Sequence, residues 1–164
     1  MADTQFYPTL PCVIFDLDGT LFDHQHRIPY LLKDPPDWEG CFAAMDLDTP
    51  ITAMHTLFRV FKAGVEQTVV VVLTGTPERF RGNVKDRLER HGLFADALIM
   101  RPDGDTREDA DFKRAALDLM RKQNWEITMV FEDRDSVVKM WRDAGVLCLQ
   151  VESAPELPIG APKG

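Results

Sequence analysis

Groups able to perform phosphoryl chemistry follow four apolar runs of the sequence. Asp16-Leu17-Asp18-Gly19-Thr20 comes directly after the first run, and Thr74-Gly75-Thr76 follows the second. Arg101 and then Lys113 follow the third run, and Glu132-Asp133 follows the fourth. Clustered carboxylates repel one another unless a hard cation binds, and Mg²⁺ prefers oxygen ligands. A carboxylate can also attack phosphorus to form an aspartyl-phosphate, while a lysine and a threonine hold the phosphoryl oxygens.

Five short apolar runs alternate with amphipathic segments and predict a buried parallel sheet. The runs are Cys12–Phe15, Val69–Leu73, Leu98–Met100, Thr128–Phe131 and Val146–Val151. Uninterrupted apolar runs are typical of strands that are covered on both faces, as in parallel sheets. Ligands of an open α/β sheet bind beyond the carboxyl ends of its strands, so the four sets of groups are expected at one edge.

Four segments between these runs carry apolar residues at helical spacing. They extend over residues 51–61, 77–88, 112–120 and 136–144, and Gly64, Gly92 and Gly145 are placed to end three of them. Pro77 is placed at the start of the second segment. Strands that alternate with helices predict βαβ units with right-handed crossovers. The expected fold class is therefore α/β, with a doubly wound, open parallel sheet of the Rossmann-like type.

The segment from residue 21 to residue 48 does not fit this alternation. It contains three prolines and little periodicity, so we expect a small irregular flap after the first strand and no large cap. An uncapped site leaves room for a bulky or polymeric substrate. Tyr30, Trp38 and Phe42 of this segment would either stack on a base or pack the flap onto the sheet. His24 and His26 lack a partner pattern and are expected at the surface.

Length and composition limit the class of protein. A chain of 164 residues is expected to form one domain, which we place at residues 1–153. A Pro-, Gly- and Ala-rich tail follows at 154–164 and is expected to be disordered. No apolar run approaches the roughly 20 residues of a membrane span, and residues 1–11 lack a signal-peptide pattern. We therefore expect no membrane association.

Charge and cysteine content limit the kinds of binding partner and the cellular compartment that we expect for this chain. The chain has 19 Lys and Arg against 27 Asp and Glu, a net charge of −8. This balance argues against broad neutralisation of a nucleic-acid backbone by a basic surface. A small phosphorylated substrate or the end of a strand fits if a bound cation inverts the local field. The three cysteines lack metal-binding spacing and predict a reducing, cytoplasmic compartment, with Cys12 and Cys148 buried in apolar runs.

The four sets of groups together resemble the motifs of haloacid dehalogenase-type phosphohydrolases, over residues 12–151. This resemblance implies that Asp16 is the nucleophile. It implies that Asp18 protonates the leaving group and later activates water, and that Thr74 and Lys113 hold the phosphoryl group. Mg²⁺ would be bound by Asp16, the backbone carbonyl of Asp18 and Asp133. Glu132 would be a further ligand or would orient a ligating water.

The second half of the chain is similar to the 3′-phosphatase domain of phage polynucleotide kinase-phosphatase. The similarity is carried by residues 100–113 and 132–142 and extends through Gly145-Val146 and Gln150-Val151. It implies removal of a 3′-phosphate from a DNA or RNA end or from a nucleoside 3′-monophosphate. The candidate substrate contacts are Gly75, Thr76, Arg101, Arg107, Asp109 and Arg134.

Two departures from the phage pattern are visible. Thr76 stands where the phage enzymes have an arginine, so the role of that arginine is either lost or taken by Arg79 or Arg81. No GxxxxGK[ST] loop occurs in the sequence, so a P-loop kinase activity is not supported. A separate kinase or ligase is the partner that this absence leaves open.

Two other functions stay open from the sequence. A 5′(3′)-nucleotidase acting on free (deoxy)nucleoside monophosphates would share every catalytic residue and differ only around the mouth of the site. A phospho-receiver module also combines acidic groups, a threonine and a lysine around an aspartyl-phosphate. The position of Asp16 after the first strand and the presence of Asp18 as an acid or base argue against a receiver. The oligomeric state is not indicated.

Overall fold

A computed structural model of the chain describes residues 9–64 and 68–152. Its centre is a parallel sheet of five strands in the order β5-β4-β1-β6-β7. The strands are β1 (Leu10–Phe15), β4 (Val69–Pro77), β5 (Ala97–Arg101), β6 (Trp125–Glu132) and β7 (Cys148–Gln150). The chain runs outward from β1 to β5 and then returns to β6 on the other side of β1. Such a switch of direction leaves a crevice at the carboxyl ends of the strands.

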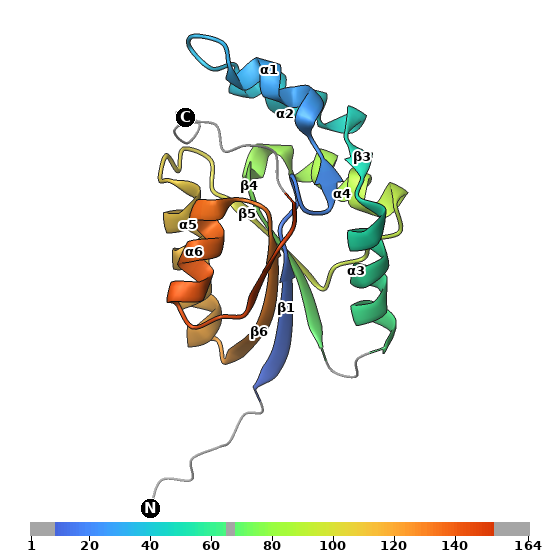
Figure 1. Cartoon of the computed structure of the whole chain (residues 1–164), viewed down its shortest axis with the longest axis vertical. Coiled ribbons are helices and arrows are strands. Elements are labelled where there is room, and N and C mark those ends of the chain that lie inside the picture. Colours follow the sequence, from blue (N-terminus) through green and yellow to red (C-terminus); the bar gives the residue numbers. More distant parts are fainter. Residues whose placement is uncertain (1–8, 65–67, 153–164) are drawn as a thin grey trace, which may run out of the picture.

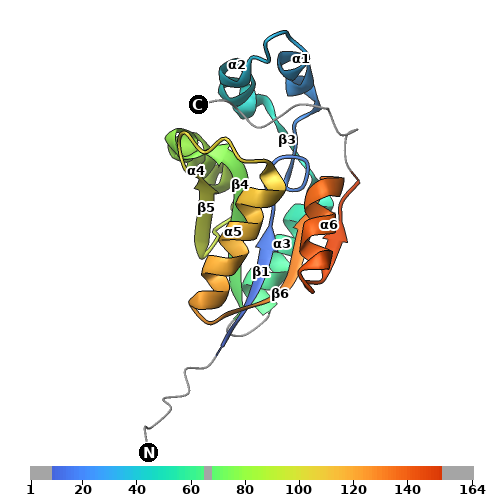
Figure 2. The same cartoon turned by 90° about the vertical axis from the view of Figure 1, so that its left-hand side faces the viewer.

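Helices cover both faces of the sheet, as Figures 1 and 2 show. α5 (Asp109–Lys122) and α6 (Asp135–Asp143) lie on one face. α3 (Thr52–Gly64) and α4 (Arg81–Arg90) lie on the other, and a short 3₁₀ turn, η3 (Glu78–Phe80), leads into α4. This arrangement confirms the predicted doubly wound, Rossmann-like α/β class.

Neighbouring residues of β1 point to opposite faces of the sheet and join different hydrophobic cores. Phe15 packs in the core beneath α3 and α4, where its ring stacks on Phe131 with centroids 4.7 Å apart. Ile14 belongs to the other core, which includes the fully buried Trp141 of α6. Burial on both faces explains why this strand is apolar without alternation. It also fixes Asp16, the next residue, at the end of a well-anchored strand.

The observed strands coincide with the predicted runs and differ from them at the ends. β4 continues to Pro77 because it pairs again with β5, opposite Arg101, after a register shift. Pro77 therefore ends a strand, whereas the sequence pattern placed it at the start of a helix. β7 covers only residues 148–150, at the edge of the sheet, where it pairs with β6 alone.

The predicted flap, residues 21–48, corresponds in the structure to residues 22–50, which connect β1 to α3 and keep this name below. The flap consists of β2 (Phe22–Asp23), η1 (Gln25–Arg27), α1 (Ile28–Leu31), α2 (Trp38–Ala43), η2 (Ala44–Leu47) and β3 (Thr49–Pro50). β2 and β3 pair as a short antiparallel ribbon, and Figure 1 shows α1 and α2 beyond the carboxyl end of β1. The flap is small, as predicted, but it is built of helical turns where the sequence indicated irregular chain. Its longest helix has six residues, too few to give a periodic signal.

The structure also bears on the predictions about membrane association and cysteines. None of the helices in residues 9–64 and 68–152 is long and apolar enough to cross a membrane. All three cysteines are buried and free, as predicted for Cys12 and Cys148. Residues 154–164, for which a disordered tail is predicted, lie outside the described residues.

Candidate active site

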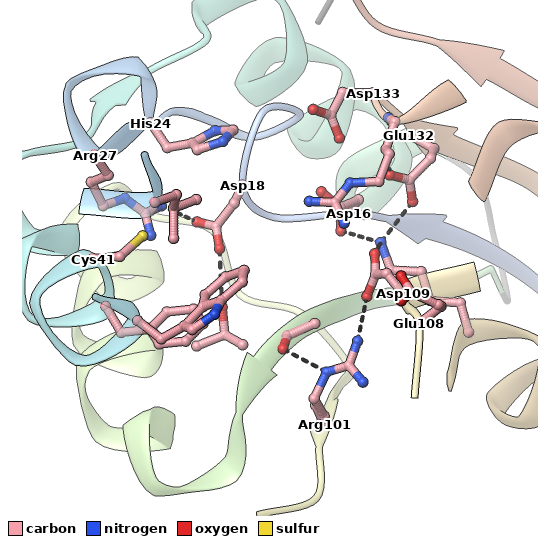
Figure 3. Close-up of a pocket in the computed structure, with 17 residues that line it drawn as sticks. Asp16, Asp18, His24, Arg27, Cys41, Arg101, Glu108, Asp109, Glu132 and Asp133 are labelled. Carbon is pink, nitrogen blue, oxygen red and sulfur yellow. Dashed lines mark hydrogen bonds and ion pairs between the residues drawn. The ribbon is translucent and has the colours of Figure 1, made fainter. Parts of the chain in front are cut away.

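Three carboxylates meet at the carboxyl edge of the sheet. Asp16 follows β1, while Glu132 ends the neighbouring strand β6 and Asp133 comes next. One carboxylate oxygen from each residue lies within 4.8 Å of the other two. All three residues are buried, and Figure 3 shows them at one side of a pocket. The predicted convergence of strand-end groups is therefore present in the structure.

Lys113 of α5 lies among these carboxylates. Its Nζ is 2.6 Å from Oδ1 of Asp16 and 2.8 Å from Oε2 of Glu132. Asp109, four residues earlier on the same helical face, has its Oδ2 3.2 Å from the same Nζ. Burial alone would lower the pKa of Lys113, but the carboxylates of Asp109, Asp16 and Glu132 outweigh it and raise that pKa well above its ordinary value. Lys113 therefore stays charged.

The carboxylates carry more negative charge than Lys113 balances. Burial raises the pKa of Asp16 well above its ordinary value, and the charge of Glu132 adds to this effect. Burial also raises the pKa of Glu132 to about 7, and burial together with Asp16 raises that of Asp133 to about 7. A bound divalent cation would reverse these shifts, and carboxylate oxygens are the ligands that Mg²⁺ prefers. Asp16, Glu132 and Asp133 therefore fit a divalent cation.

The carboxylate of Asp18 lies apart from this cluster, on the side of the flap (Figure 3). Its Oδ1 accepts hydrogen bonds from Nη2 of Arg27 at 2.6 Å and from Nη2 of Arg87 at 3.1 Å. Its Oδ2 accepts one from the hydroxyl of Thr76 at 3.0 Å. Burial opposes ionisation, but the two guanidiniums outweigh it and hold the pKa of Asp18 well below its usual range. Asp18 is therefore a carboxylate in this state.

The pocket between these two groups has a charged part and an apolar wall. The titratable residues that line it are Asp16, Asp18, His24, Arg27, Arg101, Glu108, Asp109, Lys113, Glu132, Asp133 and Arg134. The flap supplies the apolar wall, which consists of Leu31, Trp38, Cys41 and Phe42. This combination suits a phosphate ester whose leaving group carries a flat or nonpolar part.

Residues 10–155 match the family described as the polynucleotide kinase PNKP phosphatase domain. The chain belongs to this family. It is accordingly a phosphatase of the haloacid dehalogenase type, as the four motifs predicted.

Solved structures agree with this assignment. A chain of the Pnkp1/Rnl/Hen1 complex is 27% identical over 91% of this chain, with a TM-score of 0.71. A chain from a structure of the Pnkp1/Rnl/Hen1 RNA repair complex is 25% identical over 92% of this chain, with the same TM-score of 0.71. In both cases this chain spans 47% of the other chain's length. A predicted phosphatase from Clostridium acetobutylicum shares the fold, at 19% identity over 88% of this chain and 86% of that one, with a TM-score of 0.60.

In this PNKP-type phosphatase, Arg101 lines the pocket and also braces it. Its guanidinium donates to the carbonyls of Gly75 at 3.0 Å and Arg107 at 2.8 Å, and to Oδ1 of Asp109 at 2.9 Å. It thereby joins β4 to the start of α5 and orients Asp109 toward Lys113. Gly75 makes this approach feasible, because a Cβ at that position would lie 2.5 Å from Oδ1 of Asp109.

Two residues of the predicted site do not line the pocket. Thr74 is buried in β4, where its hydroxyl donates to Oγ1 of Thr76 at 3.1 Å. Arg107 is exposed, and its guanidinium pairs with Asp105. A phosphoryl contact by Thr74 and a substrate contact by Arg107 stay predictions without geometric support. Thr76 and the exposed Arg134 do line the pocket.

Neither predicted replacement for the family's missing arginine lines the pocket. Arg79 and Arg81 lie away from it and pair with carboxylates at the surface. The two guanidiniums at Asp18 come instead from Arg27 of the flap and Arg87 of α4.

The burial of Arg87 could have been inferred from the sequence, whereas that of Arg27 could not. Val84, Arg87 and Leu88 occupy one helical face, and all three are buried, so the spacing places Arg87 on the apolar stripe of α4. Arg27 stands in a segment without periodicity, and its burial depends on how the flap folds.

His24, predicted at the surface, lines the pocket instead. Its Nδ1 is buried and has no hydrogen-bond partner among the described residues. Burial lowers the pKa of His24, so the ring is neutral near pH 7. The prediction rested on polar neighbours, whereas His24 is half-buried in the structure and lies on the wall of the pocket. His26 is exposed, as predicted.

The lack of a side chain at Gly19 leaves room for the carboxylate of Asp133, and replacing this glycine provides a first test of the site. Gly19 has φ +93°, and a Cβ there would lie 2.1 Å from Oδ2 of Asp133. We expect Gly19→Ala to lower the free energy of unfolding by on the order of 1–3 kcal/mol and to raise the Mg²⁺ concentration needed for half-maximal activity. Gly82→Ala is the matched control, since nothing lies within 4 Å of a Cβ at Gly82. Equal metal dependence in both variants would contradict this role of Gly19.

Proposed function

We propose that this phosphatase removes 3′-phosphates from nucleic-acid ends or nucleotides through an aspartyl-phosphate at Asp16. The observation that carries the proposal is the place of the Asp16 carboxylate, 2.6 Å from Lys113 and in the same pocket as Asp18. A nucleophile, a cation for the phosphoryl oxygens and a proton-transfer group thus line one cavity. The membership of the PNKP phosphatase domain family supports the same substrate class.

The proposed reaction has two steps, and residues of this chain supply the nucleophile, the proton transfers and the positive charge that they need. In the first step, an oxygen of Asp16 bonds to phosphorus while the bond from phosphorus to the leaving oxygen breaks, and the protonated form of Asp18 gives its proton to that oxygen. In the second step, water bonds to phosphorus, the bond to Asp16 breaks, and the carboxylate of Asp18 accepts a proton from the water. Lys113 stabilises the charge on the phosphoryl oxygens, and Arg134 at the rim adds a second cation. The ionised state of Asp18 in this structure is the one that the second step requires.

We propose Mg²⁺ as the cofactor. Asp16, Glu132 and Asp133 would hold it, and the backbone carbonyl of Asp18 is proposed as a further oxygen ligand. When bound, it would neutralise charge that develops on the phosphoryl group.

A nucleic-acid end is favoured over a free nucleotide as the substrate. One similar chain comes from a structure described as an RNA repair complex, which supports a polynucleotide end. The flap is small and leaves the site without a large cap in the described part of the chain. A nucleotidase acting on free monophosphates is the alternative that the experiment below separates.

Phosphate release from four substrates tests the proposal. The substrates are a 3′-phosphorylated oligonucleotide, its 5′-phosphorylated counterpart, and free 3′- and 5′-mononucleotides, each with Mg²⁺ and with Asp16→Asn as the blank. Faster release from 3′-phosphorylated ends supports the proposed function. Preference for free 5′-monophosphates would overturn it in favour of a nucleotidase.

Trp38 is the residue of the flap best placed to stack on the terminal base. It lines the pocket, and its ring stacks on Phe42 beneath it, with centroids 5.8 Å apart and planes 26° apart. We expect Trp38→Ala to lower kcat/KM for a 3′-phosphorylated oligonucleotide by roughly 5- to 150-fold, the range for loss of one base–aromatic stack. Trp38→Phe is expected to retain most of the activity.

Two controls make this prediction specific. An abasic 3′-phosphate substrate should lose little with Trp38→Ala, because it has no base to stack. Leu32→Ala changes another side chain of the flap, one that is 64% exposed, and should behave like wild type. An equal loss with nucleotide and abasic substrates would show that Trp38 only supports the flap.

The sequence, the comparisons and the cysteines also support proposals about the partners and the compartment of this protein. A kinase or ligase acting on the same ends is proposed as a partner because the chain resembles one found in a structure described as an RNA repair complex. Three buried, free cysteines are compatible with a reducing compartment, and we propose the cytoplasm.

A further inference from the structure

A buried cluster of two carboxylates and two guanidiniums extends from the pocket, where Asp18 and Arg27 line the wall, into the protein interior. Asp48 accepts two hydrogen bonds from Arg27, at 2.8 Å to Nε and 2.7 Å to Nη2. Asp48 also accepts one from Nη1 of Arg87. Both arginines then reach Oδ1 of Asp18 through their Nη2 atoms. Two negative and two positive charges thus balance inside the protein.

Asp48 occupies the back of this cluster and does not line the pocket. Its side chain is fully buried, and the side chains of both arginines are no more than 2% exposed. Arg27 comes from the flap and Arg87 from α4, so Asp48, like Asp18, joins two separate elements in one arrangement. Phe22 supports Arg87 from one side, with its ring centroid 4.5 Å from the guanidinium carbon.

The arrangement fixes the orientation of the Asp18 carboxylate. Oδ1 receives two charged donors and Oδ2 receives the hydroxyl of Thr76, so three donors from the flap, α4 and β4 define the plane of the group. Asp48 sets the position of both charged donors. Charge-assisted hydrogen bonds of this kind are short and directional, so a change at Asp48 is transmitted to Asp18.

We propose that Asp48 is a positioning residue that fixes Arg27 and Arg87 and, through them, holds Asp18 in place to accept a proton from the attacking water. This inference rests on the proposed function, because it takes Asp18 as the base of the second step. The step itself is balanced: the water oxygen bonds to phosphorus, the bond from phosphorus to Asp16 breaks, and the water proton passes to Asp18. A displacement of about 1 Å in such a group can cost on the order of 100-fold in rate.

The test is pre-steady-state kinetics with p-nitrophenyl phosphate, whose leaving group departs without a proton donor. In Asp48→Asn we expect a burst of p-nitrophenolate, a kcat lower by on the order of 10- to 100-fold and a kcat/KM within about threefold of wild type. Acid quenching should recover phosphate bound to Asp16. A purely structural defect would instead reduce burst and steady-state rate together, in proportion to the folded fraction.

A matched control and a second variant distinguish a loss of positioning from a loss of folded protein. Asp46→Asn removes a nearby carboxylate that pairs with Arg90 at the surface, and it should behave like wild type. The double variant Asp48→Asn with Arg87→Gln restores the balance of buried charge, so it should melt close to wild type and still show the burst. A double variant that folds and turns over like wild type would overturn the inference.

Asp18→Asn separates this inference from the function on which it rests. If Asp18→Asn accumulates the phosphoenzyme and Asp48→Asn does not, Asp48 has no positioning role and the proposed mechanism stands. If Asp18→Asn also keeps a wild-type kcat with no burst, Asp18 is not the base, and both the mechanism and the inference fail.

Discussion

Asp16→Asn is expected to lower phosphate release by on the order of 1,000-fold or more, because it removes the oxygen that forms the covalent intermediate. The change is nearly isosteric, and it removes a charge that is already costly in this position. Burial raises the pKa of Asp16, so the neutral amide should leave the fold intact. The measurement is steady-state phosphate release with Mg²⁺, together with acid-quenched trapping of a hydroxylamine-sensitive phosphoenzyme.

Asp118→Asn is the matched control for this loss. Asp118 lies on α5, the helix that carries Lys113, but it is exposed and pairs with Arg114 at the surface. It should retain both the wild-type rate and the phosphoenzyme. Undiminished release by Asp16→Asn, or a phosphoenzyme trapped on another residue, would contradict the assignment of the nucleophile.

The sequence was sufficient to predict the sheet and the groups at its carboxyl edge. Apolar runs buried on both faces identify strands, and each strand delivers the residue after it to the same edge. Asp16, Lys113 and Glu132 could be brought together on this basis alone, because their positions depend on strand order and one helical turn. The observed contacts between them agree with that reasoning.

The second half of the site could not be predicted in the same way. Arg27 and Asp48 are buried because the flap folds back over Asp18, and short helical turns leave no periodic pattern. In sequence, buried arginines and aspartates resemble solvated ones, since their burial depends on partners far along the chain. Arg27 and Asp48 are 21 residues apart and Arg87 and Asp18 are 69 apart. Long-range pairing of this kind becomes visible only with the tertiary structure.

Removal of the metal is expected to abolish turnover and to destabilise the fold. Asp16, Glu132 and Asp133 repel one another, and burial raises the pKa of each above its ordinary value. A chelator should therefore stop phosphate release, and added Mg²⁺ should restore it. At 100 times its dissociation constant, Mg²⁺ should stabilise the protein by about 2.7 kcal/mol, which raises Tm by roughly 5–10 °C for a domain of this size.

The stabilisation by Mg²⁺ should change with pH, and the pKa values of two carboxylates set the direction of that change. Glu132 and Asp133 each have a pKa of about 7 without the cation, and Mg²⁺ binds their ionised forms. Binding therefore releases protons, so the rise in Tm should be complete above about pH 8 and should shrink as pH falls through 7. Asp133→Asn should largely abolish the rise, whereas Asp143→Asn, an exposed carboxylate on α6, should preserve it. A Tm that is insensitive to Mg²⁺ at pH 8, or a rise that grows as pH falls, would show that these carboxylates do not bind the metal.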